Sequence, residues 1–253
     1  MLNAVADGTL DGLVCTTGTI AVLDKRLSLV EAPYLFESVE RARAAFDGAL
    51  GKHCAEMAAA KNIAVLGWSE IGLRHMTANK PIRSPADLKG LKVRLPPSET
   101  MLLSFRSMGA LAEPLAFAQV PEALRTGRFD AHDNPVSIIV GAKLNEVQST
   151  LSLTGHVYTA AGIVMAPDLL EELPEADRAM MRAAAKAGVL ASRATSDRME
   201  SQGLDMLRAA GMTIVTDVDM AAMRSAGATA RERLKEVFGE ATVTQFAALA
   251  KSA

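Results

Sequence analysis

The sequence has little cysteine, few aromatic residues and no excess of positive charge, and these scarcities exclude several classes of protein. Its 253 residues include two cysteines, Cys15 and Cys54, which is too few for a disulfide framework or a zinc site, and two buried free thiols are favoured over a bond between them. The net charge of −2 indicates no nucleic-acid partner. No apolar run approaches the roughly 18 residues of a membrane span, so no membrane insertion is expected.

The sequence also lacks the common catalytic and cofactor-binding motifs. It has no phosphate-binding glycine loop of the Walker type, no GxSxG elbow and no CxxC. The one stretch that resembles a metal site is 130–133, where Asp130 and His132 would share one face of a strand but Asp133 would not. The other histidines are scattered. A small metal-dependent enzyme is therefore the least favoured function, and no cofactor is implied.

A strand that ends in an arginine is the most informative local pattern. Ser84 and Asp87 have the spacing of a helix-starting capping box, and Gly90 ends that short helix. The next residues, 92–95, alternate polar and apolar as a half-buried strand does. This strand brings Arg94 to its C-terminal end, where ligands of open α/β sheets bind.

The rest of the chain alternates strands and helices, as expected for an α/β protein of one or two domains with a sizeable core. Further strands are expected over 10–15, 63–68, 71–76, 111–115, 129–132, 157–165 and 212–215. Helices are expected over 37–61, 98–108, 120–126, 136–144, 174–210 and 220–253, with breaks near Gly48, Gly203 and Gly239. Met180, Met181 and Ala184 form an apolar stripe that is expected to lie in the core.

A short internal repeat suggests that the chain has two similar halves. The segment Gly8-Thr9-Leu10-Asp11-Gly12 recurs as Gly127-Arg128-Phe129-Asp130-Ala131. Each copy follows a helical segment and precedes an apolar strand. Two related α/β lobes with a cleft between them would explain the repeat, and chance similarity is the alternative.

Many spaced residues together resemble the DctP-type extracytoplasmic solute receptors of TRAP transporters. The likeness covers most of the chain and rests on Gly72–Arg74, Thr77, Asn79, Ala86–Pro96, Gly109-Ala110, Pro114–Phe117, Ala123-Leu124, Gly127, Asp130, Asp133–Pro135, Glu146–Gln148, Leu153–Tyr158 and Leu173-Pro174.

The resemblance implies a two-lobed α/β fold of the periplasmic binding protein type, with a ligand cleft between the lobes. Lobe I would comprise residues 1–72 continued by 160–200, and lobe II residues 73–159, while 201–253 would pack on both. Relative to the family, the chain starts inside the second helix, so the first strand–helix–strand unit and the export signal are missing from it. Periplasmic localisation is implied by the resemblance alone.

The function implied by the resemblance is that of an extracytoplasmic receptor. It would bind a small organic acid anion, a dicarboxylate or a related carboxylate, and deliver it as a monomer to TRAP membrane permease subunits for uptake. A ligand-binding sensory module of the same fold, reporting to a signalling partner, is the alternative.

Two arginines are the leading candidates for gripping the ligand. Arg94 occupies the position of the family's most characteristic ligand group, and a guanidinium matches a carboxylate through two parallel donors; a surface or lobe-stabilising arginine is the alternative. Arg74, in the run Gly72-Leu73-Arg74, matches a second arginine that reaches the carboxylate. Its alternative role is an ion pair with Glu70.

The remaining candidates would orient or cover the ligand. The amide of Asn134 both donates and accepts hydrogen bonds, although an asparagine before proline is also common in turns. Its neighbour Asp133 replaces the family's glutamate and is interpreted as structural. Phe117 matches an aromatic residue that covers the ligand, with plain core packing as the alternative. Trp68 and Glu70 are expected to line the cleft. Three strand residues of the first lobe are weaker candidates: Val14, Cys15 and Thr16.

Overall fold

The structure of the protein, a computed structural model, describes residues 1–252 and centres on one seven-stranded sheet. The strands are β1 (Gly12–Thr16), β2 (Ala64–Ala78), β3 (Lys92–Leu95), β4 (Leu111–Pro114), β5 (Ala131–Pro135), β6 (Thr150–Met165) and β7 (Thr213–Val215). Their order is β1-β6-β2-β5-β3-β4, with β7 also paired to β6. β3 pairs in parallel with β4 and β5, whereas β2 pairs antiparallel with β5 and β6. The predicted α/β class is confirmed.

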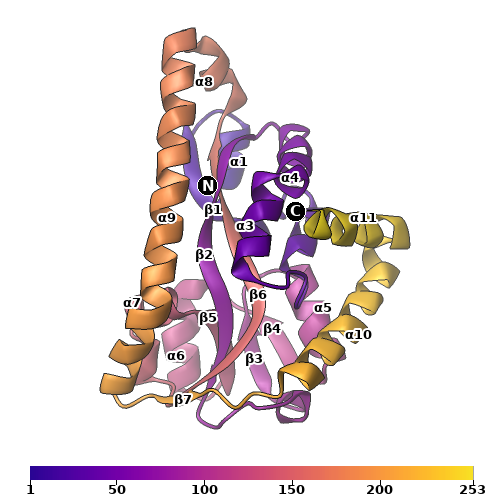
Figure 1. Cartoon of the computed structure of the whole chain (residues 1–253), viewed down its shortest axis with the longest axis vertical. Coiled ribbons are helices and arrows are strands. Elements are labelled where there is room, and N and C mark those ends of the chain that lie inside the picture. The colour runs from indigo at the N-terminus through magenta and orange to yellow at the C-terminus, as the bar shows by residue number, and fades with distance from the viewer. Residues whose placement is uncertain (253) are drawn as a thin grey trace.

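Helices cover the sheet along both of its sides (Figure 1). The α-helices are α1 (Leu2–Ala6), α2 (Thr17–Ile20), α3 (Val39–Asp47), α4 (Ala49–Ala59), α5 (Glu99–Ser107), α6 (Val120–Arg125), α7 (Val136–Gly141), α8 (Pro167–Glu172), α9 (Glu175–Ala209), α10 (Met220–Phe238) and α11 (Glu240–Lys251). The 3₁₀ helices are η1 (Lys25–Glu31), η2 (Pro85–Leu88), η3 (Phe117–Gln119) and η4 (Leu144–Glu146).

The helix breaks predicted near Gly48 and Gly239 are confirmed, but the one at Gly203 is wrong. Helix α9 runs through Gly203 for 35 residues. A Cβ atom at this position would lie 2.6 Å from Cγ1 of Val136 on α7. The glycine therefore allows two helices to approach closely instead of ending one of them.

The long strands β2 and β6 connect the two halves of the molecule, a first half with β1 and helices α1 to α4 and a second half with β3, β4, β5 and helices α5 to α7 (Figure 1). They pair from Ala64 opposite Met165 to Ala78 opposite Thr150, with register shifts between Glu70 and Gly72 and at two other places. The sequence predicted two separate strands where β2 is a single strand of 15 residues. The bulges interrupt the alternation that marks a strand in the sequence, while the backbone pairing continues across them.

Three hydrophobic clusters fill the molecule. The first surrounds Phe46 and Trp68, the second surrounds Phe105, and the third surrounds Ile139. The C-terminal segment contributes to all of them, with Phe246 in the first, Met223 in the second and Leu207 in the third. Residues 201–252 thus pack against both halves of the molecule; the lobe boundaries themselves remain predictions.

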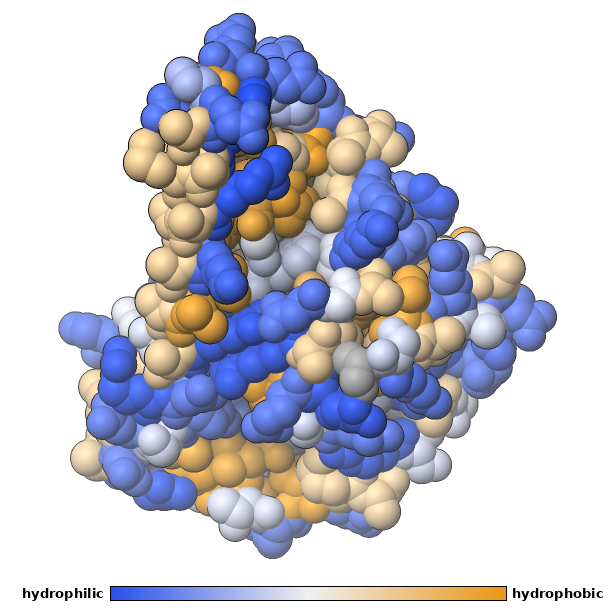
Figure 2. All heavy atoms as spheres, turned by 45° about the horizontal axis from the view of Figure 1, so that its top comes forward, coloured by the Kyte–Doolittle hydropathy of each residue, from blue (hydrophilic) through white to orange (hydrophobic). Residues whose placement is uncertain are grey.

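The stripe on α9 that was expected in the core lies at the surface. Met180 is 63% exposed and Ala184 is also exposed. In Figure 2, weakly apolar atoms follow this helix along the outside of the molecule. The prediction fails because the side of the helix that is buried here carries Ala185 and Val189, and Val189 fills the space beside Gly67 of β2.

The internal repeat of the sequence corresponds to a repeated structure. Helix α1, a turn, β1 and α2 follow one another as α6, a turn, β5 and α7 do. Gly8 and Gly127 stand at the same place in the two copies and have φ values of +76° and +70°, a region that glycine adopts without strain. In both copies the strand passes directly into a helix, and the two strand–helix junctions point to a shared site.

Candidate functional site

A cavity of about 400 Å³ lies between the two halves of the chain. The first half lines it with Thr16, Gly18, Thr19 and Glu31, and the long strands β2 and β6 contribute Ile71, Arg74 and Thr159. The second half contributes Arg94, Pro96, Pro97, Ser98, Ala116, Phe117, Asn134 and Ile138. Both repeated strand–helix junctions therefore contribute to its wall. At roughly 30 Å³ per water molecule, the cavity is large enough for a small organic molecule.

Arg94 is a buried cation without an acidic partner in the part of the chain that the structure describes. Its side chain leaves β3 towards the cavity, and the residue is 2% exposed. Nε donates a hydrogen bond to the carbonyl oxygen of Leu115 at 2.9 Å, and Nη2 donates to the same oxygen. Burial lowers the pKa of the guanidinium to about 10, the nearby Asp133 opposes this shift, and the like charge of Arg74 adds to it. An anion entering the cavity would relieve this uncompensated charge.

Arg74 also lines the cavity, but its charge is already compensated. Nε and Nη2 donate to the Asp133 carboxylate at 2.6 and 2.9 Å. The alternative of an ion pair with Glu70 is therefore wrong, because Asp133 occupies that role from the neighbouring strand β5. His156 Nε2 lies 3.1 Å from the same carboxylate. Burial would raise the pKa of Asp133, but the Arg74 charge and these hydrogen bonds hold it well below its usual range.

Polar atoms without partners gather around the cavity. Within residues 1–252, no hydrogen bond is made by Asn134 Nδ2, Glu31 Oε2 or Thr159 Oγ1, all three of which are buried. The other amide atom of Asn134, Oδ1, accepts from Arg74 Nη2 at 3.3 Å and so fixes the orientation of the amide. A buried polar atom left unpaired costs about 1–3 kcal/mol. These atoms are placed to bind a polar ligand.

Sequence reasoning missed Glu31, the acidic residue of the cavity. Its Oε1 accepts hydrogen bonds from the Gly18 backbone N–H at 3.0 Å and from the Thr17 hydroxyl at 3.1 Å. Burial raises the pKa of the carboxyl, and the Ser98 hydroxyl and the Arg74 charge oppose the shift. The available signal was a single acid inside the apolar run of residues 29–36.

The Phe117 ring is at the cavity and not in the core, so the core-packing alternative is wrong. The residue is 44% exposed, and its ring centroid lies 6.0 Å from the Arg94 guanidinium carbon. Of the first-lobe strand candidates, Thr16 lines the cavity. Val14, which is 62% exposed, and Cys15 are not among the lining residues.

Trp68 and Glu70 lie outside the cavity wall, contrary to expectation. Trp68 is buried beside Phe46, and its Nε1 donates to the Gly51 carbonyl oxygen at 3.0 Å. Glu70 accepts from Arg43 at 2.6 and 2.9 Å and from the Tyr158 hydroxyl at 2.6 Å. Both side chains thus have packing and hydrogen-bonding partners of their own.

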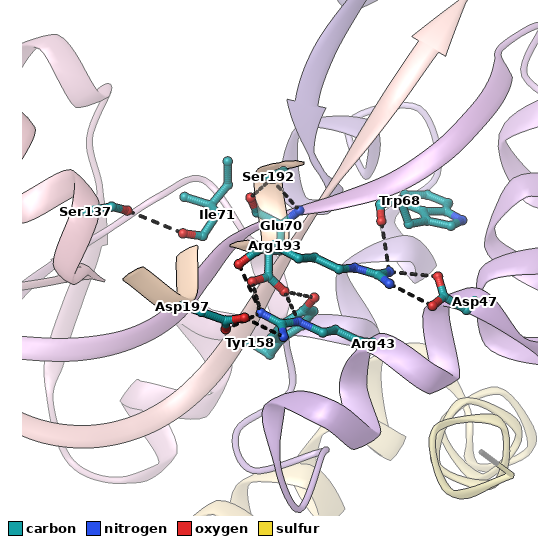
Figure 3. A network of polar contacts seen from close by, with 10 residues as sticks. All are labelled: Arg43, Asp47, Trp68, Glu70, Ile71, Ser137, Tyr158, Ser192, Arg193 and Asp197. Carbon is teal, nitrogen blue, oxygen red and sulfur yellow. Dashed lines mark hydrogen bonds and ion pairs between the residues drawn. The ribbon is translucent and has the colours of Figure 1, made fainter. Parts of the chain in front are cut away.

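The Glu70 contacts belong to a network that ties α3 to α9 across β2 (Figure 3). Arg43 of α3 also donates to Asp197 of α9 at 2.6 Å. A second pair runs the other way, since Arg193 of α9 donates both of its terminal nitrogens to Asp47 of α3 at 2.7 Å. The arrangement joins α3, β2 and α9 and indicates a structural role for Glu70.

Replacement of Glu70 by glutamine should lower stability without changing ligand affinity. Removing the charge leaves Arg43 paired with Asp197, so we expect the free energy of unfolding to fall by about 2 kcal/mol. Denaturant unfolding and ligand titration measure the two quantities. Glu236→Gln, in an exposed pair with Arg233, is the control and should change stability by less than about 0.5 kcal/mol. A loss of ligand affinity at unchanged stability would mean that Glu70 takes part in ligand binding.

The stretch 130–133 and the two cysteines form no site in the part of the chain that the structure describes. Residues 1–252 contain no group of three His, Cys, Asp or Glu side chains that could hold a metal ion. The Asp130 carboxylate accepts from the backbone of Lys92, whereas the His132 ring contacts the Thr77 hydroxyl. Cys15 and Cys54 are free thiols, as predicted, although Cys15 is only half-buried. None of the described helices is long and apolar enough to cross a membrane.

The sequence matches one protein family over almost its whole length. A family model described as "Bacterial extracellular solute-binding protein, family 7" (DctP) matches residues 1–237. A solute-binding protein of Verminephrobacter eiseniae is 34% identical over 245 residues, which are 96% of this chain and 73% of that protein. The 2,3-diketo-L-gulonate-binding periplasmic protein YiaO of Escherichia coli is 32% identical over 228 residues, 89% of this chain and 69% of YiaO.

The fold is similarly close to a solved structure. A TRAP periplasmic solute-binding protein from Polaromonas sp. JS666, crystallised with D-erythronate, superposes with a TM-score of 0.91 at 34% identity. The match covers 98% of this chain and 82% of that one. The two-lobed binding-protein fold expected from the sequence is confirmed by this similarity.

Proposed function

The chain belongs to the DctP family of bacterial extracellular solute-binding proteins, family 7, and from this premise we propose that it captures a small organic acid anion in the cavity between its halves. Arg94 binds the carboxylate through the guanidinium N–H groups that do not donate to Leu115. Asn134 Nδ2 donates to the same group, and Phe117 covers it. Arg74 holds the Asn134 amide in place and adds positive potential.

The observation that carries this proposal is the buried, unpaired charge of Arg94. A cation that is 2% exposed and has no acid within ion-pair distance in residues 1–252 is costly to maintain unless an anion visits it. A carboxylate is the anion that matches a planar guanidinium through two hydrogen bonds. The unpaired donor on Asn134, close to Arg74, is available to the same ligand.

Two relatives support a carboxylate ligand. YiaO is named for binding 2,3-diketo-L-gulonate, and the Polaromonas protein holds D-erythronate. Both ligands are small organic acid anions, and both proteins are more than 30% identical to this chain. We carry over the carboxylate and leave open the remainder of the ligand.

The receptor works in the periplasm as a monomer and delivers its ligand to the membrane permease of a TRAP-type transporter. Lobe I (1–72 with 160–200) and lobe II (73–159) close on the anion, and the long strands β2 and β6 connect them. Closure excludes water and strengthens the ion pair with Arg94. Binding and release need no covalent step and no cofactor, so we assign the protein a transport role and no enzymatic one.

A thermal-shift screen of the full chain tests the proposal. The panel contains small organic acids, with neutral sugars and amines as controls. Because a ligand that binds only the folded state stabilises it, an acid at about 100 times its dissociation constant should raise the melting temperature by about 5 °C or more. A cooperative melt that no acid shifts would contradict the proposal.

A further inference from the structure

The Glu31 carboxylate faces the cavity with the Ser98 hydroxyl near it, but Oε2 accepts no hydrogen bond from the described residues. Glu31 ends η1, which is tied to α5 through a contact of 2.7 Å between the Ser28 and Thr100 hydroxyl oxygens. Glu31 is 3% exposed, and its Oε2 has no hydrogen-bond partner in residues 1–252. A Cβ atom on Gly18 would lie 2.9 Å from both carboxylate oxygens. Only glycine at position 18 allows the backbone to lie this close to the carboxylate, and this backbone holds the carboxylate in place.

The cavity offers a free cation for one ligand carboxylate and, within residues 1–252, none for a second. Arg74 and Asp133 compensate each other through a pair at 2.6 Å. This leaves Arg94, on the wall formed by the second half, and Glu31, on the wall formed by the first half. A ligand carboxylate placed on Arg94 pairs with this cation. A second carboxylate at the other end of the ligand would face the Glu31 carboxyl, where burial already disfavours negative charge.

We propose that Glu31 is a specificity residue that selects hydroxylated monocarboxylates over dicarboxylates. This proposal rests on the carboxylate site proposed above. The ligand's carboxylate binds Arg94 and Asn134, and a hydroxyl of the same ligand donates to Glu31 Oε2. The unpaired Thr159 Oγ1, also buried at the cavity, is available to a further hydroxyl. A ligand hydroxyl can donate to Glu31 Oε2, whereas an ionised carboxylate can only accept.

Acids matched in chain length test the proposal by isothermal titration calorimetry of the full chain at neutral pH. Erythronate and succinate share a four-carbon skeleton, and galactonate and adipate extend the comparison to six carbons. We expect the hydroxy acid of at least one pair to bind about tenfold or more tightly than its dicarboxylate, since one hydrogen bond to a charged group is gained and one repulsion is avoided.

The variant Glu31→Gln keeps the size and the acceptor for Thr17 and Gly18 but presents an amide donor in place of the unpaired acceptor. We expect its preference for the hydroxy acid to fall by about tenfold, because the amide can donate to a second carboxylate. Glu122→Gln removes an equal charge from an exposed residue of α6 and should leave the preference unchanged. Thermal melting of the ligand-free variants checks that they fold.

The outcomes separate the two proposals. If the dicarboxylate binds as well as the hydroxy acid in both pairs, or if a folded Glu31→Gln variant keeps the wild-type preference, the role of Glu31 is overturned while the carboxylate site stands. If none of the four acids nor any other organic acid binds the wild-type chain, the carboxylate site itself fails. If Glu31→Gln does not fold, the wild-type preference decides.

Discussion

Replacement of Arg94 by methionine is expected to abolish organic acid binding and to stabilise the ligand-free protein. Removing the partner of a buried carboxylate costs at least about 3 kcal/mol, a loss of more than about 100-fold in affinity. In the free protein the same change removes a cation that is buried without an acid, so the free energy of unfolding should rise by about 1 kcal/mol. A loss of affinity together with a gain in stability is expected when a side chain serves ligand binding and not folding.

Three further variants make the Arg94 result specific. Arg94→Ala should also lose binding, and Arg94→Lys should bind poorly because it keeps the charge but not the paired donors. Arg106→Met is the control, since Arg106 also donates to a carbonyl oxygen, that of Ala112, at 2.9 Å but lies outside the cavity wall. Calorimetric titration and denaturant unfolding give the two free energies. Wild-type ligand affinity in Arg94→Met would mean that Arg94 does not bind the ligand.

Local signals explain why part of the site was predictable. The strand that carries Arg94 has the predicted bounds, Lys92–Leu95, because glycine and proline punctuate the sequence on either side. The strand after the left-handed Gly127 was also recognised, but β5 runs from Ala131 to Pro135, whereas 129–132 was predicted. Arg94, Arg74, Asn134 and Phe117 lie together at the cavity. That they bind the ligand remains a prediction.

The bulges of β2 explain why Trp68 and Glu70 were misplaced. In a regular strand, residues an even number apart share a face, so Glu70 would point the same way as Arg74. The register shift between Glu70 and Gly72 inserts one extra residue and reverses the faces. Ile71 and Arg74 therefore line the cavity, while Glu70 points towards Arg43 (Figure 3). Bulges depend on pairing with β6, far away in the sequence.

Contacts between distant segments account for the other failures. Asp133 pairs with Arg74 across 59 residues of chain, and the exposure of Phe117 depends on how the two halves meet. Glu31 became a site residue because the α2 backbone satisfies one of its oxygens and leaves the other free. None of these relations has a short-range pattern. The residues of the repeat could be recognised in the sequence, but the part that Glu31 plays in the site could not.

Replacement of Asp133 by asparagine is the second change from which we expect a large effect, this time on folding. Both partners of the Arg74–Asp133 pair are buried, with side chains 7% and 0% exposed. Breaking such a pair leaves an uncompensated cation in the interior, and the free energy of unfolding at neutral pH should fall by about 3–5 kcal/mol. Asp217→Asn is the control because its pair with Arg83 is largely exposed, and it should leave the stability almost unchanged.

The pH dependence of this stability difference has a definite sign. Because the folded-state pKa of Asp133 lies below the ordinary value of 3.8, folding favours the ionised carboxylate, and the stabilisation is fully present above that value. The stabilisation is lost as the pH falls below 3.8 towards the folded-state pKa. Denaturant unfolding of both proteins should therefore give a constant difference between about pH 7 and pH 5 that shrinks in more acidic solution. A difference that grows on acidification, or one below about 1 kcal/mol at neutral pH, would mean that the ion pair does not hold β2 and β5 together beneath the cavity.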